Sequence, residues 1–445
     1  MTTGSEWKQI LIFTLPLMAG NFLQQIYSLA DSLVAGNMVS ETALAAIGVV
    51  FPITFLLLAV ALGFSNGCGV IVSQYFGAGD IPNVRRAVST TLLTAIAGGI
   101  LVSVIGLLIA RPMLVYVLGT PDNILPLALT YMRVYCLGLT FQFIYNTTAA
   151  ALRSLGDSSA TLYFLIIAAV LNVGLDILLA PYLGVAGIAL ATTVAQAGCA
   201  AASLIYLFRR ITILHYGKGE FAFDPKMFRL SMRLGVPTII QQCSVGLGMI
   251  LMQRLINSFG EDAIAATSAG MKVETFVQVP IMMFFQGLAS FTGQNTGAGK
   301  LDRVRRGYHQ TLVMSLLCCA VIIAIIFTFS SQIVACFGLS EEACALGTRY
   351  LRCLVLFFPI FCVMYTTNGV LEGSGDVIFP TIGSITSLGT RVVSANLLAA
   401  FTTLGYASIY TSIPIGWTAG TIIVVARYLN GGWKRKAIAG SRKAS

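Results

Sequence analysis

The sequence predicts an all-α membrane protein that crosses the bilayer many times. Of its 445 residues, 57% are hydrophobic and only 10% are charged, and the mean hydropathy is +0.85. Soluble globular domains contain about 25% charged residues. Apolar stretches of roughly 20 residues, the length an α-helix needs to cross the hydrocarbon core, recur along the chain. A transmembrane β-barrel would instead show short alternating segments, which this sequence lacks.

Twelve apolar stretches, separated by polar residues, Gly or Pro, are expected to form transmembrane helices. The first is too long for the core of a signal peptide, so we expect it to be retained. The expected spans cover residues 9–36, 44–74, 87–109, 126–150, 159–181, 187–208, 230–257, 264–292, 309–328, 346–370, 378–401 and 407–429.

The two halves of the chain repeat each other. Residues 74–86, QYFGAGDIPNVRR, match residues 294–306, QNTGAGKLDRVRR, at an offset of 220. Tyr131 matches Tyr350 at an offset of 219. An offset that stays this constant indicates duplication. Because each half has an even number of spans, both halves point the same way. We therefore expect two six-helix lobes related by a pseudo-two-fold axis along the membrane normal, with the substrate site between them.

Basic residues predict how the chain is oriented. If the N-terminus is cytoplasmic, 20 of the 27 Lys and Arg residues fall in cytoplasmic segments. Both termini are therefore expected on the cytoplasmic side of the plasma (inner) membrane. The net charge of +10 then reflects topology and not a surface for nucleic acid. The expected domains are a first lobe, a cytoplasmic linker, a second lobe and a basic cytoplasmic tail, at residues 1–208, 209–229, 230–429 and 430–445.

Asp31 is the only charged residue between Ile10 and Val39. A carboxylate at that depth costs roughly 2.5 to 3.5 kcal/mol on insertion scales, and it usually marks an ion or substrate path. Gln24 and Tyr27 share its helical face, so this helix is expected to have a polar stripe. Pro16 allows the helix to bend and is a predicted hinge. The alternative is that Asp31 only ties neighbouring helices together.

A second carboxylate falls in the fifth span of the same half. Asn172 and Asp176 are four residues apart, on one helical face. The matching positions of the second half contain no acid. Asp31 corresponds to Met252 or Gln253, Asn172 to Arg391 and Asp176 to Ala395. Two carboxylates and neutral oxygens suit a hard cation, and they suit equally a proton shared by two acids. The residues leave Na⁺ and H⁺ open, and helix–helix hydrogen bonding is the alternative role of Asn172 and Asp176.

Glu274 is a carboxylate within a span of the second half. It lies about 15 Å into the eighth span, with Gln278 on the same face and Pro280 as a kink beyond them. Glu274 and Gln278 are candidates to line the cleft, and Pro280 and Pro237, the match of Pro16, are candidate hinges. The alternative is a structural carboxylate that Arg391 or Lys272 neutralises.

Together these motifs resemble the MATE family, the multidrug and toxic compound extrusion transporters. The resemblance covers nearly all twelve spans. It depends on the helix from Pro16 to Asp31 with residues 43–48 after it, the paired QxxGAG loops, LRSLGD at residues 152–157, and Asn172-x-x-x-Asp176. The family implies two lobes in a V, alternating access and cation-driven export of drugs, often organic cations.

The resemblance also assigns residues. In the prokaryotic branch with a cation site in the N-terminal lobe, the ion-binding roles fall on Asp31, Asn172 and Asp176, with a threonine of the sixth span that best fits Thr193. Gln24 and Tyr27 match positions that line the cleft. The chain departs from the branch with a Glu in span seven and an Asp in span ten, because span seven has no acid and span ten has Asn368.

We therefore expect a monomeric antiporter, coupled to Na⁺ or H⁺, that exports drug-like small molecules and contacts membrane lipid, without any other cofactor. A flippase for a lipid-linked or other amphipathic substrate is the alternative on the same architecture. For a pyrophosphate it would need a cleft rich in Arg and Lys, whereas only Lys272 and Arg391 are deep cations. An enzyme would need a metal cluster or a nucleophile–base pair, and the sequence shows neither, so we do not expect an enzyme.

Overall fold

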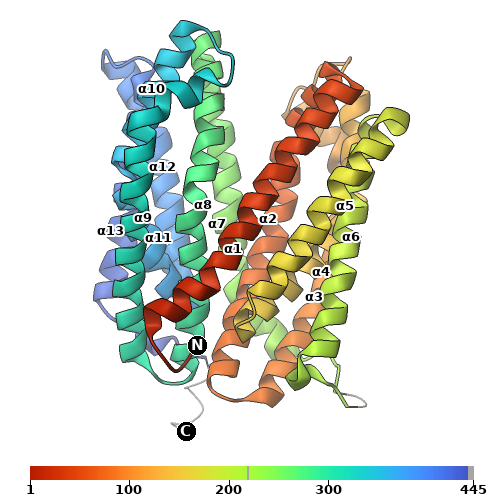
Figure 1. Ribbon diagram of the computed structural model, residues 1–445, viewed down its shortest axis with the longest axis vertical. Helices are drawn as coiled ribbons and strands as arrows, with labels where there is room; N and C mark the ends of the chain where they lie inside the picture. Colours follow the sequence, from red (N-terminus) through yellow and green to blue (C-terminus); the bar gives the residue numbers. More distant parts are fainter. Residues whose placement is uncertain (218–219, 439–445) are drawn as a thin grey trace. The chain divides into compact units, whose positions relative to one another are not determined.

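The computed structural model describes residues 1–217 and 220–438, and these form thirteen α-helices and no strand (Figure 1). The predicted tail at 430–445 is thus described only as far as Ile438, and Lys218 of the linker also lies outside the described residues. Each of the twelve expected spans coincides with a helix or, in one case, with a pair of helices. The first six are α1 (Glu6–Val34), α2 (Glu41–Gly77), α3 (Ile81–Pro112), α4 (Leu125–Leu155), α5 (Ser159–Leu183) and α6 (Val185–Arg210).

The second half contains seven helices because its fourth span is broken. Pro359 lies in the first turn of α11, where its missing N–H and its ring are incompatible with a continuous helix. The two pieces bend by 50°. The helices are α7 (Pro225–Asn257), α8 (Glu261–Gly297), α9 (Leu301–Ala335), α10 (Glu341–Leu356), α11 (Phe358–Gly373), α12 (Ile378–Phe401) and α13 (Ala407–Leu429).

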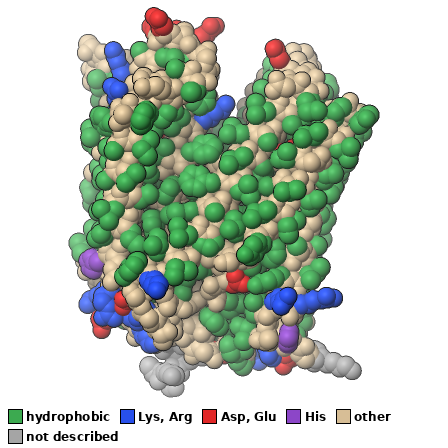
Figure 2. Space-filling model, in the orientation of Figure 1, with side chains coloured by type: hydrophobic (Ala, Val, Ile, Leu, Met, Phe, Trp, Pro, Cys, Tyr) green, Lys and Arg blue, Asp and Glu red, His purple; other side chains and the backbone are tan. Residues whose placement is uncertain are grey.

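Ten of the described helices are long and apolar enough to cross a membrane, and the bent pair α10–α11 makes up to eleven. The helix that is not among them, α12, contains several Ser and Thr residues together with Arg391. Hydrophobic side chains cover the middle of the face shown in Figure 2, while most charged side chains gather near its ends. This distribution is typical of a protein that passes through a bilayer many times.

The helices group into two compact units. We call Leu15–Gln242 the first lobe, and Met1–Thr14 with the chain from Cys243 onwards the second lobe. This grouping differs in two places from the boundaries expected at residues 208 and 230. The start of α1 belongs to the second lobe, and the linker with the first half of α7 belongs to the first lobe.

Residues 1–14 join the second lobe at the helical hairpin formed by α8 and α9, where Arg303 and Arg306 lie in the first turns of α9. Glu6 accepts a hydrogen bond from Arg306 at 3.0 Å and forms an ion pair with Arg303 at 3.3 Å. Arg303 also donates to the Gly4 carbonyl at 2.9 Å. Further along the helix, Ile10 is fully buried in the core of this lobe. These contacts explain why the first turns of α1 group with helices far away in sequence.

The linker contacts the matching hairpin of the first lobe, between α2 and α3. Arg85 donates to the Ile213 carbonyl at 2.7 Å and pairs with Glu220 at 3.1 Å. The hydroxyl of Tyr216 donates to the Arg85 carbonyl at 2.9 Å. In each half of the repeat, the segment that precedes the first helix therefore binds the arginine-containing hairpin of the other half.

Candidate functional site

Asp31 and Asp176 meet inside the first lobe. Asp31 lies one turn before the end of α1, and Asp176 is fully buried on α5. Their carboxyl groups are close enough to share a hydrogen bond. One oxygen of Asp31 and both oxygens of Asp176 are buried and receive no hydrogen bond from the described residues. The structure thus brings together two predicted ligands and leaves their oxygens available.

Asn172 completes one side of this cluster, and the threonine that it contacts is Thr192. The Asn172 amide donates to the Thr192 hydroxyl at 3.4 Å, while its own carbonyl oxygen is buried without a partner among the described residues. Thr193, the predicted ligand, instead donates to the carbonyls of Ala189 and Val134, on the α4 side of α6. Because adjacent helical residues face different directions, only one threonine can contact Asn172, and it is Thr192.

Two tyrosines surround the carboxyl pair. Tyr27 lies one helical turn before Asp31 on α1 and feels its charge, and Gln24 is exposed. The charges of Asp31 and Asp176 both act on Tyr131 of α4. Tyr131 is not among the predicted site residues, although its match with Tyr350 across the repeat was a signal that could have identified it.

This arrangement can bind a small cation or a proton. Two buried carboxylates without donors repel each other, and either a proton or a cation between them removes that repulsion. The oxygens of Asp31, Asn172, Asp176 and Thr192 are the hard donors that Na⁺ accepts, whereas transition metals prefer nitrogen or sulfur. Among the described residues, no group of three or more His, Cys, Asp or Glu side chains is placed to bind a metal.

Glu274 is held by neutral partners within the second lobe. The Tyr350 hydroxyl and the Gln278 amide each donate to its carboxylate at 2.7 Å. The charge of Arg391 also acts on it. Lys272 is exposed and lies 6.0 Å from the ring of Phe337, so it does not provide the compensation. Neutralisation of Glu274 by Arg391 and lining of the cleft by Glu274 and Gln278 both stay predictions.

The three predicted hinge prolines lie inside helices that continue past them. Pro16, Pro237 and Pro280 are interior to α1, α7 and α8. Pro16 stands two residues after Thr14, where α1 passes from one compact unit to the other. A proline removes one backbone hydrogen bond and permits bending at that point, so hinge motion at Pro16 stays a prediction with a structural basis.

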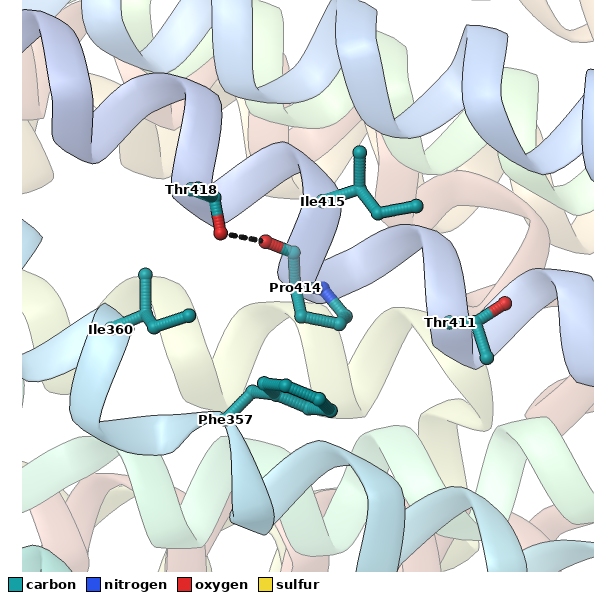
Figure 3. Close-up of a pocket in the computed structure, with 6 residues that line it drawn as sticks. All are labelled: Phe357, Ile360, Thr411, Pro414, Ile415 and Thr418. Carbon is teal, nitrogen blue, oxygen red and sulfur yellow. Dashed lines mark hydrogen bonds between the residues drawn. The ribbon is translucent and has the colours of Figure 1, made fainter.

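A cavity of ≈ 260 Å³ lies elsewhere in the second lobe, between the α10–α11 break and α13 (Figure 3). Its walls are mostly apolar, and the Thr411 and Thr418 hydroxyls donate to carbonyls of their own helix at 2.8 and 2.7 Å. No predicted site residue lines this cavity, and its polar atoms are already engaged. The carboxyl cluster of the first lobe is therefore the better candidate for function. The lining residues are Phe357, Ile360, Thr411, Pro414, Ile415 and Thr418.

The MatE family model matches residues 16–178 and 237–397, one segment in each half of the repeat. These segments cover most of the chain, so the protein belongs to the MATE family of membrane transporters and is not an enzyme. The match confirms the family to which the sequence motifs pointed.

Curated relatives are named for drug resistance. The probable multidrug resistance protein YoeA of Bacillus subtilis is 28% identical over 444 residues, covering 98% of this chain and 96% of its own. The multidrug export protein MepA of Staphylococcus aureus is 22% identical and covers 85% of this chain and 84% of its own. A crystal structure of MATE in the bent conformation superposes with a TM-score of 0.90 at 22% identity, covering 98% of this chain and 97% of that one. That likeness confirms the predicted twelve-span fold.

Proposed function

We propose that this protein is a cation-coupled antiporter that exports drugs or other toxic organic compounds. The observation that supports it most directly is the pair of buried carboxylates, Asp31 and Asp176, with oxygens that no described residue satisfies. The names of the curated relatives support small-molecule drugs as the substrates. We propose that the protein acts as a monomer in the cell membrane, in contact with lipid.

The coupling ion in this proposal is Na⁺ or H⁺, bound by Asp31, Asn172, Asp176 and Thr192. An ion drives export only if the ion and the drug favour different conformations of the transporter. We infer that occupancy of the carboxyl pair bends α1 near Pro16. That movement would displace Gln24 and Tyr27, which lie on the same helix as Asp31, and so release the drug.

Reconstituted protein tests this function. Liposomes containing the purified transporter and a fluorescent organic cation should export the dye when a Na⁺ or an H⁺ gradient is imposed, one gradient at a time. The ion that drives export identifies the coupling ion. If neither gradient drives transport of cationic or neutral dyes, while a labelled amphipathic lipid is moved across the bilayer, the flippase alternative replaces the antiporter.

Orientation with both termini in the cytoplasm can be tested with the native Cys336, which is exposed at the end of α9. A membrane-impermeant maleimide should label Cys336 from outside intact cells, and Cys336→Ser should abolish that labelling. In the Cys336→Ser background, Lys434→Cys should react only after the membrane is permeabilised. Labelling of Lys434→Cys in intact cells would contradict the orientation.

A further inference from the structure

Basic residues gather at the end of the second lobe where α9 begins and α13 ends (Figure 1). Four of them are engaged, through an ion pair with Glu6 or Asp376 or a hydrogen bond to a backbone carbonyl: Lys300, Arg303, Arg306 and Arg427. Four others, which we call the basic patch, form no ion pair with any acid that the structure describes: Arg305, Lys434, Arg435 and Lys436. Because Asp302 is the only acid of α9, this end of the lobe carries excess positive charge.

A stack of aromatic rings holds the segment after α13 against α9. The ring centroids of Tyr308 and Tyr428 are 4.4 Å apart, and the Trp433 ring stacks on Tyr428 at 5.8 Å. Trp433 is fully buried, and its indole N–H donates to the Tyr428 carbonyl at 3.2 Å. Arg305 precedes Tyr308 by one helical turn, and the Lys434 Nζ lies 5.9 Å from the Trp433 ring. The cations of α9 and of this segment therefore belong to one surface.

An exposed apolar row continues from the basic patch along α9. Residues four apart follow one another along one side of a helix. Starting from Arg305, this spacing passes His309, which is exposed, and then reaches four apolar side chains. These are 56%, 64%, 59% and 48% exposed, in the order Val313, Leu317, Val321 and Ile325. A cationic end followed by an apolar row matches the two parts of a phospholipid, the charged headgroup and the acyl chain.

The equivalent arginine of the first lobe is already occupied. Arg85, which matches Arg305 at an offset of 220, pairs with Glu220 at 3.1 Å and donates to the Ile213 carbonyl at 2.7 Å. The linker thus neutralises Arg85, whereas no described acid does so for Arg305. A preference for basic residues on the cytoplasmic side explains how many there are, but it does not explain why only one of two matching arginines is paired.

We propose that the basic patch and the apolar row of α9 bind an anionic phospholipid. Arg305 and the cations after α13 hold the headgroup phosphate, since Arg and Lys donate charge-assisted hydrogen bonds to phosphate oxygens. An acyl chain lies along Val313 and Leu317. Clusters of four or more basic residues immediately beyond a transmembrane helix attract anionic lipids in this way. The inference does not depend on which ion or drug the protein transports.

Native mass spectrometry of the purified protein tests the proposal. The protein in detergent is titrated with phosphatidylglycerol or with phosphatidylcholine that carries the same acyl chains, and we expect phosphatidylglycerol to bind more tightly. The triple variant Arg305→Gln/Arg435→Gln/Lys436→Gln should bind phosphatidylglycerol roughly 100-fold more weakly, because each basic residue near an anionic surface contributes about fivefold in affinity. Its affinity for phosphatidylcholine should equal that of the wild type.

The matched control is Arg209→Gln/Arg210→Gln/Arg229→Gln, which removes three exposed cations from the first lobe. This control should keep the wild-type affinity for phosphatidylglycerol. Both triple variants should unfold at the wild-type temperature in detergent alone, because surface substitutions change stability little. Equal binding of the two lipids by the wild type, or an equal loss in the control, would overturn the proposal. Displacement of the lipid by equimolar inorganic phosphate would also overturn it, because the ligand would then be a free anion.

Discussion

Asp31→Asn is expected to fold and insert like the wild type but to lose ion-driven export by about 10- to 100-fold, the equivalent of one hydrogen bond to a charged group. Asparagine is nearly isosteric with aspartate and is less costly to bury than an unpaired carboxylate, so the helix bundle should tolerate it. The loss should appear in the liposome assay as export rate per folded transporter, under whichever ion gradient drives the wild type.

Asp176→Asn should behave in the same way, and the double variant should be hardly worse than either single one, because residues that act as a unit are not additive. Thr193→Val is the matched control. The Thr193 hydroxyl donates to backbone carbonyls and not to Asn172, so this substitution should leave ion dependence intact. Full activity of Asp31→Asn, or losses in the two single variants that multiply in the double one, would show that the acids do not share one site.

Gly67→Ala is expected to destabilise the first lobe by about 1 to 3 kcal/mol, the usual effect of overpacking. A Cβ on Gly67 of α2 would lie 2.8 Å from the backbone nitrogen of Gly235 and 3.0 Å from the Ser231 carbonyl oxygen, both on α7. Backbone atoms cannot rotate away, so the two helices would have to separate. The measurement is the thermal unfolding midpoint of the protein in detergent.

Gly48→Ala on the same helix provides the control for Gly67→Ala. A Cβ at Gly48 meets nothing within 4 Å, so the substitution should be neutral or stabilise the helix by up to about 1 kcal/mol. If both variants unfold at the wild-type temperature, close contact between α2 and α7 does not limit stability.

Local patterns predicted the helices well, because each span is long, apolar and bounded by polar or Gly/Pro residues. They also predicted Asp31, Asn172 and Asp176 as one cluster, since helical spacing and the repeat both constrain those positions. The choice between Thr192 and Thr193 depends on the rotation of α6 against α5 and α4, which adjacent residues do not encode. The structure places Thr192 beside Asn172. The interpretation of Glu274 stayed open for a similar reason. Its hydrogen-bond partner Tyr350 comes from α10, and only the fold places the two together.

The binding of residues 1–14 to the second lobe has a consequence for biosynthesis. Glu6 contacts Arg303, which is synthesised 297 residues later. At 5 to 20 residues per second, the ribosome takes roughly 15 to 60 s to reach it. The start of α1 therefore waits in the membrane without its final neighbours while most of the protein is made. The linker has no such delay, because Arg85 already exists when Glu220 emerges. The start of α1 thus gains these contacts only after α8 has been synthesised.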